Sequence, residues 1–131
     1  MSKNKKICSF IYPGRNDSYN PHFLHRLNYV LEFTAKNINE LGLNHFFDLA
    51  VIDWGSDKKF RNELQLSHTG VELVKFYEIS KEITLKEVVP KNFFHLTKII
   101  NAGIRNIDSN YILIASHDVI MSKVSILNLY N

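Results

Sequence analysis

Short apolar runs alternate along this chain with stretches whose apolar residues recur at helical spacing. Residues 7–12, 46–53 and 111–115 form nearly continuous apolar runs of strand length, which is typical of strands buried on both faces. A further strand is predicted over residues 71–79, where charged positions interrupt the apolar ones. The pattern therefore predicts four strands.

The clearest helix signal lies between the first two predicted strands. Asn20 supplies a capping residue and Pro21 suits the first helical position, while Gly42 provides a stop. Between these signals the apolar residues fall at helical spacing: Phe23, Leu24, Leu27, Val30, Leu31, Ile38 and Leu41. The sequence therefore predicts one long helix that begins after Asn20 and ends before Gly42.

Two more helices are predicted further along the chain. A short one covers residues 57–66, with Ser56 as its cap, and a longer amphipathic one covers residues 93–107. Residues 80–92 are mixed in character and contain Pro90, so they are expected to form an irregular connection. Residues 124–130 begin either a helix or a strand.

The alternation of apolar strands with amphipathic helices predicts an α/β fold. Such strands assemble into a mostly parallel sheet with helices on both faces, which is a three-layer α/β/α arrangement. A length of 131 residues lies within the range of one domain and is sufficient to bury a core. Because no linker or repeat divides the chain, we expect a single domain over residues 1–131.

Composition and charge exclude some classes of function. Hydrophobic residues make up 45% and charged residues 22% of the chain, which are ordinary values for a globular protein. The net charge of +3 is mild, and no stretch interleaves basic and aromatic residues as nucleic-acid-binding surfaces do. We therefore expect no nucleic-acid partner.

The single cysteine, Cys8, bears on the compartment. One thiol cannot form an internal disulfide, which fits a reducing environment, and its place in an apolar run indicates a small buried hydrophobe. The N-terminal lysines precede no apolar segment long enough for a leader, and no run has the length of a membrane span. The sequence therefore predicts a cytoplasmic protein and leaves association with a membrane surface open.

Polar clusters follow three of the predicted strands. They comprise residues 13–17, residues 53–57 and residues 116–118. Ligands of open parallel α/β sheets bind outside the carboxyl ends of the strands, so three clusters at three such ends are expected to converge on one crevice. Each cluster alone also has a structural explanation, since Asn16, Asp53 and Asp118 are residue types that shape turns and cap helices.

The order of these clusters resembles that of family-2-like glycosyltransferases of the GT-A fold. In that family a first strand ends in proline and asparagine, a second ends in an Asp-Asp-Gly-Ser-like motif, a later helix carries Arg-Asn-x-Gly-Ile, and the next strand runs into Asp-x-Asp. The matching stretches here are Pro13 with Asn16, Asp53-Trp54-Gly55-Ser56, Ile100-Asn101-Ala102-Gly103-Ile104 and Ser116-His117-Asp118. Gly14-Arg15-Asn16-Asp17 also resembles a bacterial subgroup of the family. The similarity extends over most of the chain, from about residue 7 to about residue 121.

The resemblance implies a binding site for a nucleotide-diphosphate sugar, with a UDP-sugar as the expected donor and a glycan or other acceptor. It assigns the nucleotide to Pro13, Arg15, Asn16, Asp53, Asn101 and Gly103, with Asp53 contacting the base, and assigns a divalent metal, Mn or Mg, to Asp118. A hard cation held by carboxylate would neutralise the charge of the leaving diphosphate. Trp54 would either stack on a base or sugar or anchor the second strand.

Three departures from the family pattern bear on catalysis. Ser116 replaces the first acid of Asp-x-Asp, so only one carboxylate remains for the metal. Ile100 replaces the basic residue before Asn101. Residues 119–131 contain no acid that would deprotonate an acceptor hydroxyl, so the chain is expected to be the N-terminal, donor-binding part of such an enzyme, either as a fragment of a longer protein or as a naturally truncated one.

Two other functions remain open at this stage. The first is a non-catalytic nucleotide-sugar-binding or interaction module, which the loss of the first metal-binding acid favours. The second is a flavodoxin-like or receiver-like module, which also carries acids at strand ends. The second is disfavoured because Asn101, Gly103 and the 116–118 cluster would have no role in it.

Overall fold

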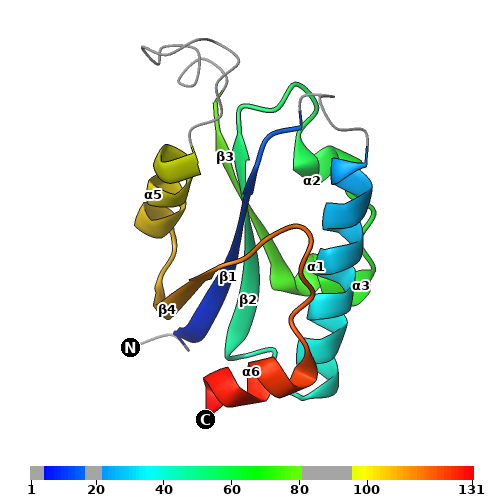
Figure 1. Ribbon diagram of the computed structural model, residues 1–131, viewed down its shortest axis with the longest axis vertical. Helices are drawn as coiled ribbons and strands as arrows, with labels where there is room; N and C mark the ends of the chain where they lie inside the picture. Colours follow the sequence, from blue (N-terminus) through cyan, green and yellow to red (C-terminus); the bar gives the residue numbers. More distant parts are fainter. Residues whose placement is uncertain (1–4, 17–21, 81–95) are drawn as a thin grey trace.

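The computed structural model describes residues 5–16, 22–80 and 96–131 (Figure 1). Helices and strands alternate through most of this part of the chain. In order they are β1 (Lys6–Gly14), α1 (Phe23–Glu40), β2 (Phe47–Trp54), α2 (Phe60–Glu63), α3 (His68–Leu73), β3 (Val74–Ile79), α5 (Leu96–Asn106), β4 (Ser109–Ile114) and α6 (Lys123–Tyr130). The predicted α/β class is therefore confirmed.

The four strands form one sheet in the order β3-β2-β1-β4, and all neighbouring strands are parallel. Leaving β1, the chain adds β2 and β3 on one side and then returns to add β4 on the other. The direction of winding thus reverses between β1 and β4. Such a reversal leaves a crevice outside the carboxyl ends of the two strands, where α/β proteins commonly bind their ligands.

Helices cover both faces of the sheet, which gives the three layers expected (Figure 1). Alternate residues of β1 point to opposite faces, as the pleat of a strand requires. Phe10 and Tyr12 pack with α1, together with Phe60 of α2 and Leu73 of α3, in one core cluster. Ile11 packs with Ile99 of α5 in a second cluster on the other face.

The first predicted helix agrees closely with the structure. It corresponds to α1, and Gly42 follows it with a φ of 70°, a conformation that glycine adopts without steric cost. The Gly42 N–H donates to the carbonyl of Asn39 at 3.0 Å, which satisfies one of the last carbonyls of the helix. The proposed N-terminal signals, Asn20 and Pro21, lie outside the described residues.

Two predicted elements are wrong in their extent. The helix expected over 57–66 is a single turn, α2, and Ser56 does not cap it because its hydroxyl is bound to Asp53. The strand expected from residue 71 begins only at Val74. Residues 68–73 form α3 instead, because the Ser67 hydroxyl accepts the Gly70 N–H and caps a helical turn.

The C-terminal residues form a helix, which settles the alternative left open for 124–130. Ser122 caps α6 by accepting the Ser125 N–H at 3.2 Å, and Ile126 enters the core beside α1. Lys123 forms an ion pair with Glu40 at the end of α1. The hydrogen bond from Lys123 lowers the pKa of the Glu40 carboxyl.

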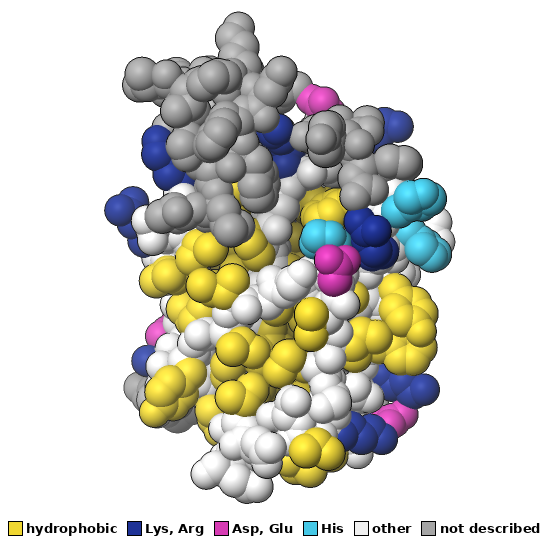
Figure 2. Space-filling model, in the orientation of Figure 1, with side chains coloured by type: hydrophobic (Ala, Val, Ile, Leu, Met, Phe, Trp, Pro, Cys, Tyr) yellow, Lys and Arg dark blue, Asp and Glu magenta, His cyan; other side chains and the backbone are white. Residues whose placement is uncertain are grey.

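The burial expected for the 111–115 run is only partly observed. The central strands β1 and β2 are almost wholly buried, but β4 lies at the edge of the sheet and most of its residues are exposed or half-buried. Figure 2 shows apolar side chains gathered on the face of the molecule that carries β4. The apolar sequence of β4 therefore does not reflect burial on both faces in this structure.

The described helices bear on the question of a membrane. None of them combines the length and the apolar character that crossing a bilayer requires.

Candidate functional site

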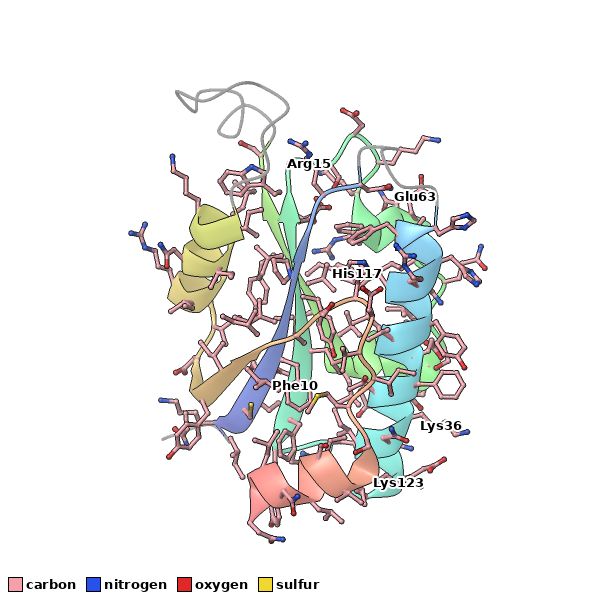
Figure 3. All side chains as sticks on the ribbon, viewed as in Figure 1. Phe10, Arg15, Lys36, Glu63, His117 and Lys123 are labelled. Carbon is pink, nitrogen blue, oxygen red and sulfur yellow. The ribbon has the colours of Figure 1, made fainter. Side chains whose placement is uncertain are left out.

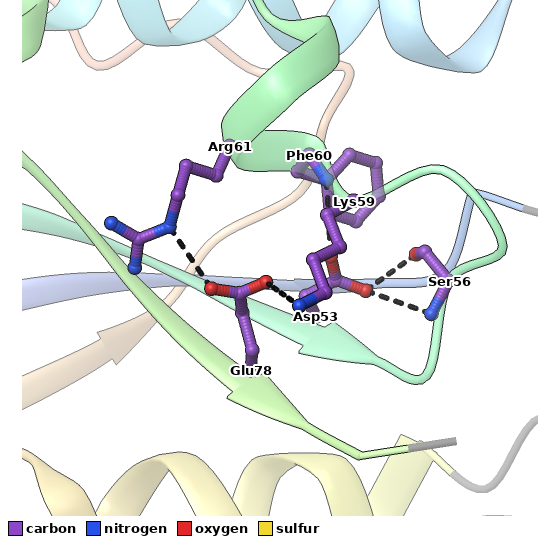
Figure 4. Close-up of polar contacts among 6 residues, drawn as sticks. All are labelled: Asp53, Ser56, Lys59, Phe60, Arg61 and Glu78. Carbon is purple, nitrogen blue, oxygen red and sulfur yellow. Dashed lines mark hydrogen bonds and ion pairs between the residues drawn. The ribbon is translucent and has the colours of Figure 1, made fainter.

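Asp53 lies at the carboxyl end of β2, and its side chain closes the loop that follows. The residue is 1% exposed. One carboxylate oxygen accepts both the backbone N–H of Ser56, at 3.1 Å, and the Ser56 hydroxyl, while the other accepts the Phe60 N–H at 3.0 Å (Figure 4). Gly55, with a φ of 61°, makes the turn between them. The observed role of Asp53 is therefore to fix the β2–α2 loop and the start of α2, and its contact with a nucleotide base stays a prediction.

Asn16 ties the end of β1 to this same loop. Its backbone N–H donates to the Ser56 hydroxyl at 2.7 Å, and its side-chain amide donates to the Lys58 carbonyl at 3.0 Å. These contacts are possible because β1 and β2 are adjacent, with Gly14 in register with Asp53. Asn16, Ser56 and Asp53 thus form one network, as the predicted convergence requires.

Pro13 and Arg15 lie on either side of Gly14 at the carboxyl end of β1. Pro13 is the penultimate residue of the strand and is half-buried, in register with Ile52. Arg15 follows the strand, and Figure 3 shows it beyond the carboxyl ends of the central strands. The guanidinium lies near the point where the loops that follow β1 and β2 meet. Its positive charge at this place suits contact with an anionic ligand.

An aromatic cluster brings the residues after β4 to the end of β1. The Phe23 ring lies 5.8 Å from the Phe60 ring and 4.6 Å from the His117 ring. A β-carbon on Gly14 would lie 2.8 Å from the Phe23 ring, so the glycine permits the ring to approach the strand. Phe23 therefore connects the β1 end, α2 and the 116–118 segment.

Asp118, the predicted metal ligand, lies in this segment and its side chain is 59% exposed. One of its oxygens is 3.4 Å from Arg26 Nε of α1 and 3.3 Å from His117 Nε2, and its backbone N–H donates to the Ser116 hydroxyl at 3.3 Å. Among the residues that the structure describes, no three His, Cys, Asp or Glu side chains gather as a metal site. Asp118 is thus an accessible single carboxylate beside the point where the direction of winding reverses between β1 and β4.

Asn101 and Gly103 do not join this group. They belong to α5, on the opposite face of the sheet, where Asn101 is exposed and Gly103 is buried. A β-carbon on Gly103 would lie 2.9 Å from the Ile52 side chain, so the glycine allows α5 to pack closely on β2. Close packing of helix against sheet accounts for Gly103 in this structure, and nucleotide contacts of the two residues stay predictions.

A valine at position 103 is expected to destabilise the protein. Because the added side chain would meet Ile52, Gly103→Val should lower the free energy of unfolding by about 1–3 kcal/mol. Arg105→Val, at an exposed position of the same helix, should cost no more than about 0.7 kcal/mol of helix propensity. Urea unfolding followed by circular dichroism would measure both, and equal losses would argue against the packing role of Gly103.

Glu78 is a charged residue of this region that sequence reasoning missed. It lies beside Asp53 in the sheet register, and it pairs with Lys59 at 3.6 Å and with Arg61 at 2.9 Å (Figure 4). Arg61 also lies over the Phe76 ring. Its position near the end of the predicted third strand was the available signal, because ligands of parallel sheets bind outside the carboxyl ends of the strands. The ion pairs hold α2 over β3.

Two other residues have structural explanations. Trp54 is buried in the cluster that includes Ile52 and Ile99, so it anchors the end of β2. Burial raises the pKa of the Cys8 thiol to about 11, so at neutral pH the thiol is protonated and behaves as the small hydrophobe expected.

Comparison with known proteins adds no family assignment. No protein-family model matches the chain. No curated protein is significantly similar to it. The likeness to family-2-like glycosyltransferases therefore rests on the order of the motifs in the sequence.

Proposed function

We propose that this chain is the donor-binding domain of a GT-A-type glycosyltransferase that binds a nucleotide-diphosphate sugar, with a UDP-sugar as the expected donor. The observation that carries the proposal is the reversal of winding between β1 and β4, with Arg15 and Asn16 after one strand and the 116–118 segment after the other. This is the position where ligands of parallel α/β sheets bind.

The proposal gives distinct tasks to the residues at the end of β1. Arg15 supplies a planar cation for phosphate or ribose oxygens. Asn16 holds the β1 and β2 loops together through Ser56 and the Lys58 carbonyl, so that the nucleotide would meet a fixed surface. Asp53 supports this surface from its buried side, because both of its carboxylate oxygens accept hydrogen bonds from the loop between β2 and α2.

A divalent metal, Mn or Mg, would bind at Asp118. The exposed carboxylate suits a hard cation, and phosphate oxygens of the donor and water would have to complete the coordination shell. Metal binding would also replace the contacts of Asp118 with Arg26 and His117, which are long enough, at 3.4 and 3.3 Å, to be exchanged. When bound, the metal would neutralise charge on the leaving diphosphate.

A second candidate function is a non-catalytic module that binds the nucleotide sugar without transferring it. The position of Ser116 favours it, since its hydroxyl accepts the Asp118 N–H in place of offering a second carboxylate. Transfer to a glycan or other acceptor, as in bacterial surface polysaccharide synthesis, would require a general base as well. We place either function in the cytoplasm, with action at a membrane surface compatible with it.

Calorimetric titration with UDP and several UDP-sugars, with Mn or Mg and then with EDTA, tests the donor site. We expect binding that requires the metal and that Asp118→Ala weakens about tenfold or more, by analogy with other losses at metal sites. Asp108→Ala is the matched control, because Asp108 is also exposed and paired with a base, Lys5, but precedes β4.

Three kinds of result would refute a part of the proposal or distinguish the two functions. Failure to bind any nucleotide would refute the donor-site proposal for this chain. Equal weakening by Asp118→Ala and Asp108→Ala would refute the specific role of Asp118. Release of UDP from a bound UDP-sugar favours the enzyme, and tight binding without release favours the non-catalytic module.

A further inference from the structure

The segment between β4 and α6, residues 115–122, carries Asp118 but forms neither helix nor strand. It leaves the sheet and crosses to the side of the molecule that α1 covers (Figure 1). A segment without a regular ladder of backbone hydrogen bonds is placed by its contacts with neighbouring elements. The position of the Asp118 carboxylate therefore depends on how α1 holds this segment.

Two side chains of α1 bind the backbone of Met121, shortly after Asp118. The Met121 N–H donates to Thr34 Oγ1 at 3.3 Å, and the Met121 carbonyl accepts the side-chain amide of Asn37 at 2.9 Å. Thr34 and Asn37 lie on one face of the helix because of their i, i+3 spacing. Both backbone groups of Met121 are therefore satisfied by one helix, much as a neighbouring strand would satisfy them.

Two other contacts between α1 and the segment differ in kind from this one. Arg26 Nε and His117 Nε2 lie 3.4 and 3.3 Å from an oxygen of Asp118, at the carboxylate where the proposed metal would bind. These contacts would be exchanged for the metal, whereas the hydrogen bonds of Met121 would remain. The ring contact between Phe23 and His117 would also remain, but apolar packing is less directional than a hydrogen bond.

We propose that Asn37 is a positioning residue of the donor site, which fixes Met121 and thereby the place of Asp118. This inference rests on the proposed function, because the task exists only if Asp118 binds the metal and the donor. Asn37 acts through the backbone of the segment and does not itself touch the ligand. A carboxylate that is held in place before binding loses less conformational freedom when the ligand arrives, and affinity increases accordingly.

Asparagine is an unfavourable residue for the interior of a helix, because its helix propensity is well below that of alanine. Asn37 lies within α1 and is half-buried. Its hydrogen bond to the Met121 carbonyl gives a physical reason for an asparagine at this position. The same facts make the residue suitable for substitution, since alanine would regain in helix propensity much of what the lost hydrogen bond costs.

Asn37→Ala tests the proposal through the binding of UDP in the presence of Mn, measured by calorimetric titration. We expect an unchanged urea midpoint and a dissociation constant raised about tenfold, as for other residues that orient a metal ligand. In the Asp118→Ala background the same substitution should change the constant less than about twofold, because the carboxylate that Asn37 places is absent. A residue that merely supported the fold would not show this dependence on Asp118.

Asn39→Ala is the matched control. Asn39 is an exposed asparagine of the same helix, and its side chain accepts a hydrogen bond from Asn44 at 2.8 Å, outside the 115–122 segment. Weakening by Asn37→Ala that Asn39→Ala does not reproduce, and that depends on Asp118, supports the proposal. Unchanged UDP affinity in Asn37→Ala, equal weakening by Asn39→Ala, or a tenfold loss that persists in the Asp118→Ala background would overturn it.

A measurement without nucleotide covers the case in which Asn37→Ala lowers the urea midpoint. Hydrogen exchange at the Met121 amide, followed by NMR in the folded protein, should become about threefold faster or more in Asn37→Ala and stay unchanged in Asn39→Ala. Equal exchange in all three proteins would overturn the placement of the segment by Asn37. A chain that binds no nucleotide would refute the proposed function and the positioning role together, whereas binding that Asn37→Ala leaves intact would refute the positioning role alone.

Discussion

Phe60→Ala is expected to lower the free energy of unfolding by about 3–5 kcal/mol, the usual cost of removing a fully buried phenylalanine. The Phe60 ring lies in the core beneath α2, 5.8 Å from the Phe23 ring. Its removal would leave a cavity at the junction of the β1 end, α1 and α2. Urea unfolding monitored by circular dichroism would measure the loss.

The control for this prediction is a phenylalanine at the surface. Phe33 lies on α1 against Tyr29 and is 38% exposed, so Phe33→Ala should cost no more than about 1 kcal/mol. Phe60→Leu, which retains most of the volume, should cost less than about 1.5 kcal/mol. Similar losses for Phe60→Ala and Phe33→Ala would contradict the place of Phe60 in the core.

Asp53→Ala should lower the free energy of unfolding by about 3 kcal/mol, because removal of the carboxylate leaves buried hydrogen-bond donors without an acceptor. The Phe60 N–H and the Ser56 N–H would lose their acceptor inside the loop. Trp54, the only tryptophan, follows Asp53 in β2 and is buried on the opposite face of the sheet, with Ile99 of α5. Its emission therefore reports on global unfolding, and a lower urea midpoint of that signal would be the measured signature.

Two further variants define what the Asp53 result means. Asp53→Asn keeps the size of the side chain but replaces one carboxylate oxygen with an NH₂ group, which cannot accept the hydrogen bonds of the loop. It should therefore also lower the free energy of unfolding, by about 2 kcal/mol. Asp108→Ala, at an exposed ion pair, should change the free energy of unfolding by about 0.5 kcal/mol or less. If Asp53→Ala removed nucleotide binding while stability was unchanged, the residue would be a ligand contact and not the loop support seen here.

The strong effect expected at Asp53 also changes how the proposed donor site should be tested. A variant that loosens the β2–α2 loop would lose binding whether or not Asp53 touches the ligand. Asp118 and Asn16 are better probes, because Asp118 is exposed and the Asn16 side chain makes, among the residues that the structure describes, one exposed hydrogen bond, to the Lys58 carbonyl. Asn16→Ala keeps the backbone link to Ser56 and removes that side-chain bond.

Much of the fold was predictable because it depends on local patterns. Continuous apolar runs predicted β1, β2 and β4, and a helical spacing closed by Gly42 predicted α1. The alternation of these elements predicted a parallel sheet between helices, which is confirmed. The error at Val71 arose because apolar residues near a strand can also belong to a helical turn, and the Ser67 cap decided between the two.

The candidate site was predictable in its location but not in its contacts. That Asn16 and Asp53 lie at neighbouring strand ends followed from their places after apolar runs, and the structure brings them into one network. The sequence could not show that the Asp53 carboxylate is used by its own loop, or that Asp118 meets Arg26 of α1. Hydrogen-bond partners depend on which donors reach the same place after packing, and no local pattern encodes that.

Local patterns in the sequence were sufficient to predict most of the secondary structure, the α/β class and the end of the sheet at which polar residues gather. Tertiary structure alone decided the order β3-β2-β1-β4, and with it the reversal between β1 and β4 and the exposure of Tyr111 at an edge. The reason is physical: apolar runs show which segments seek burial, but the pairing of strands determines which of them obtain it.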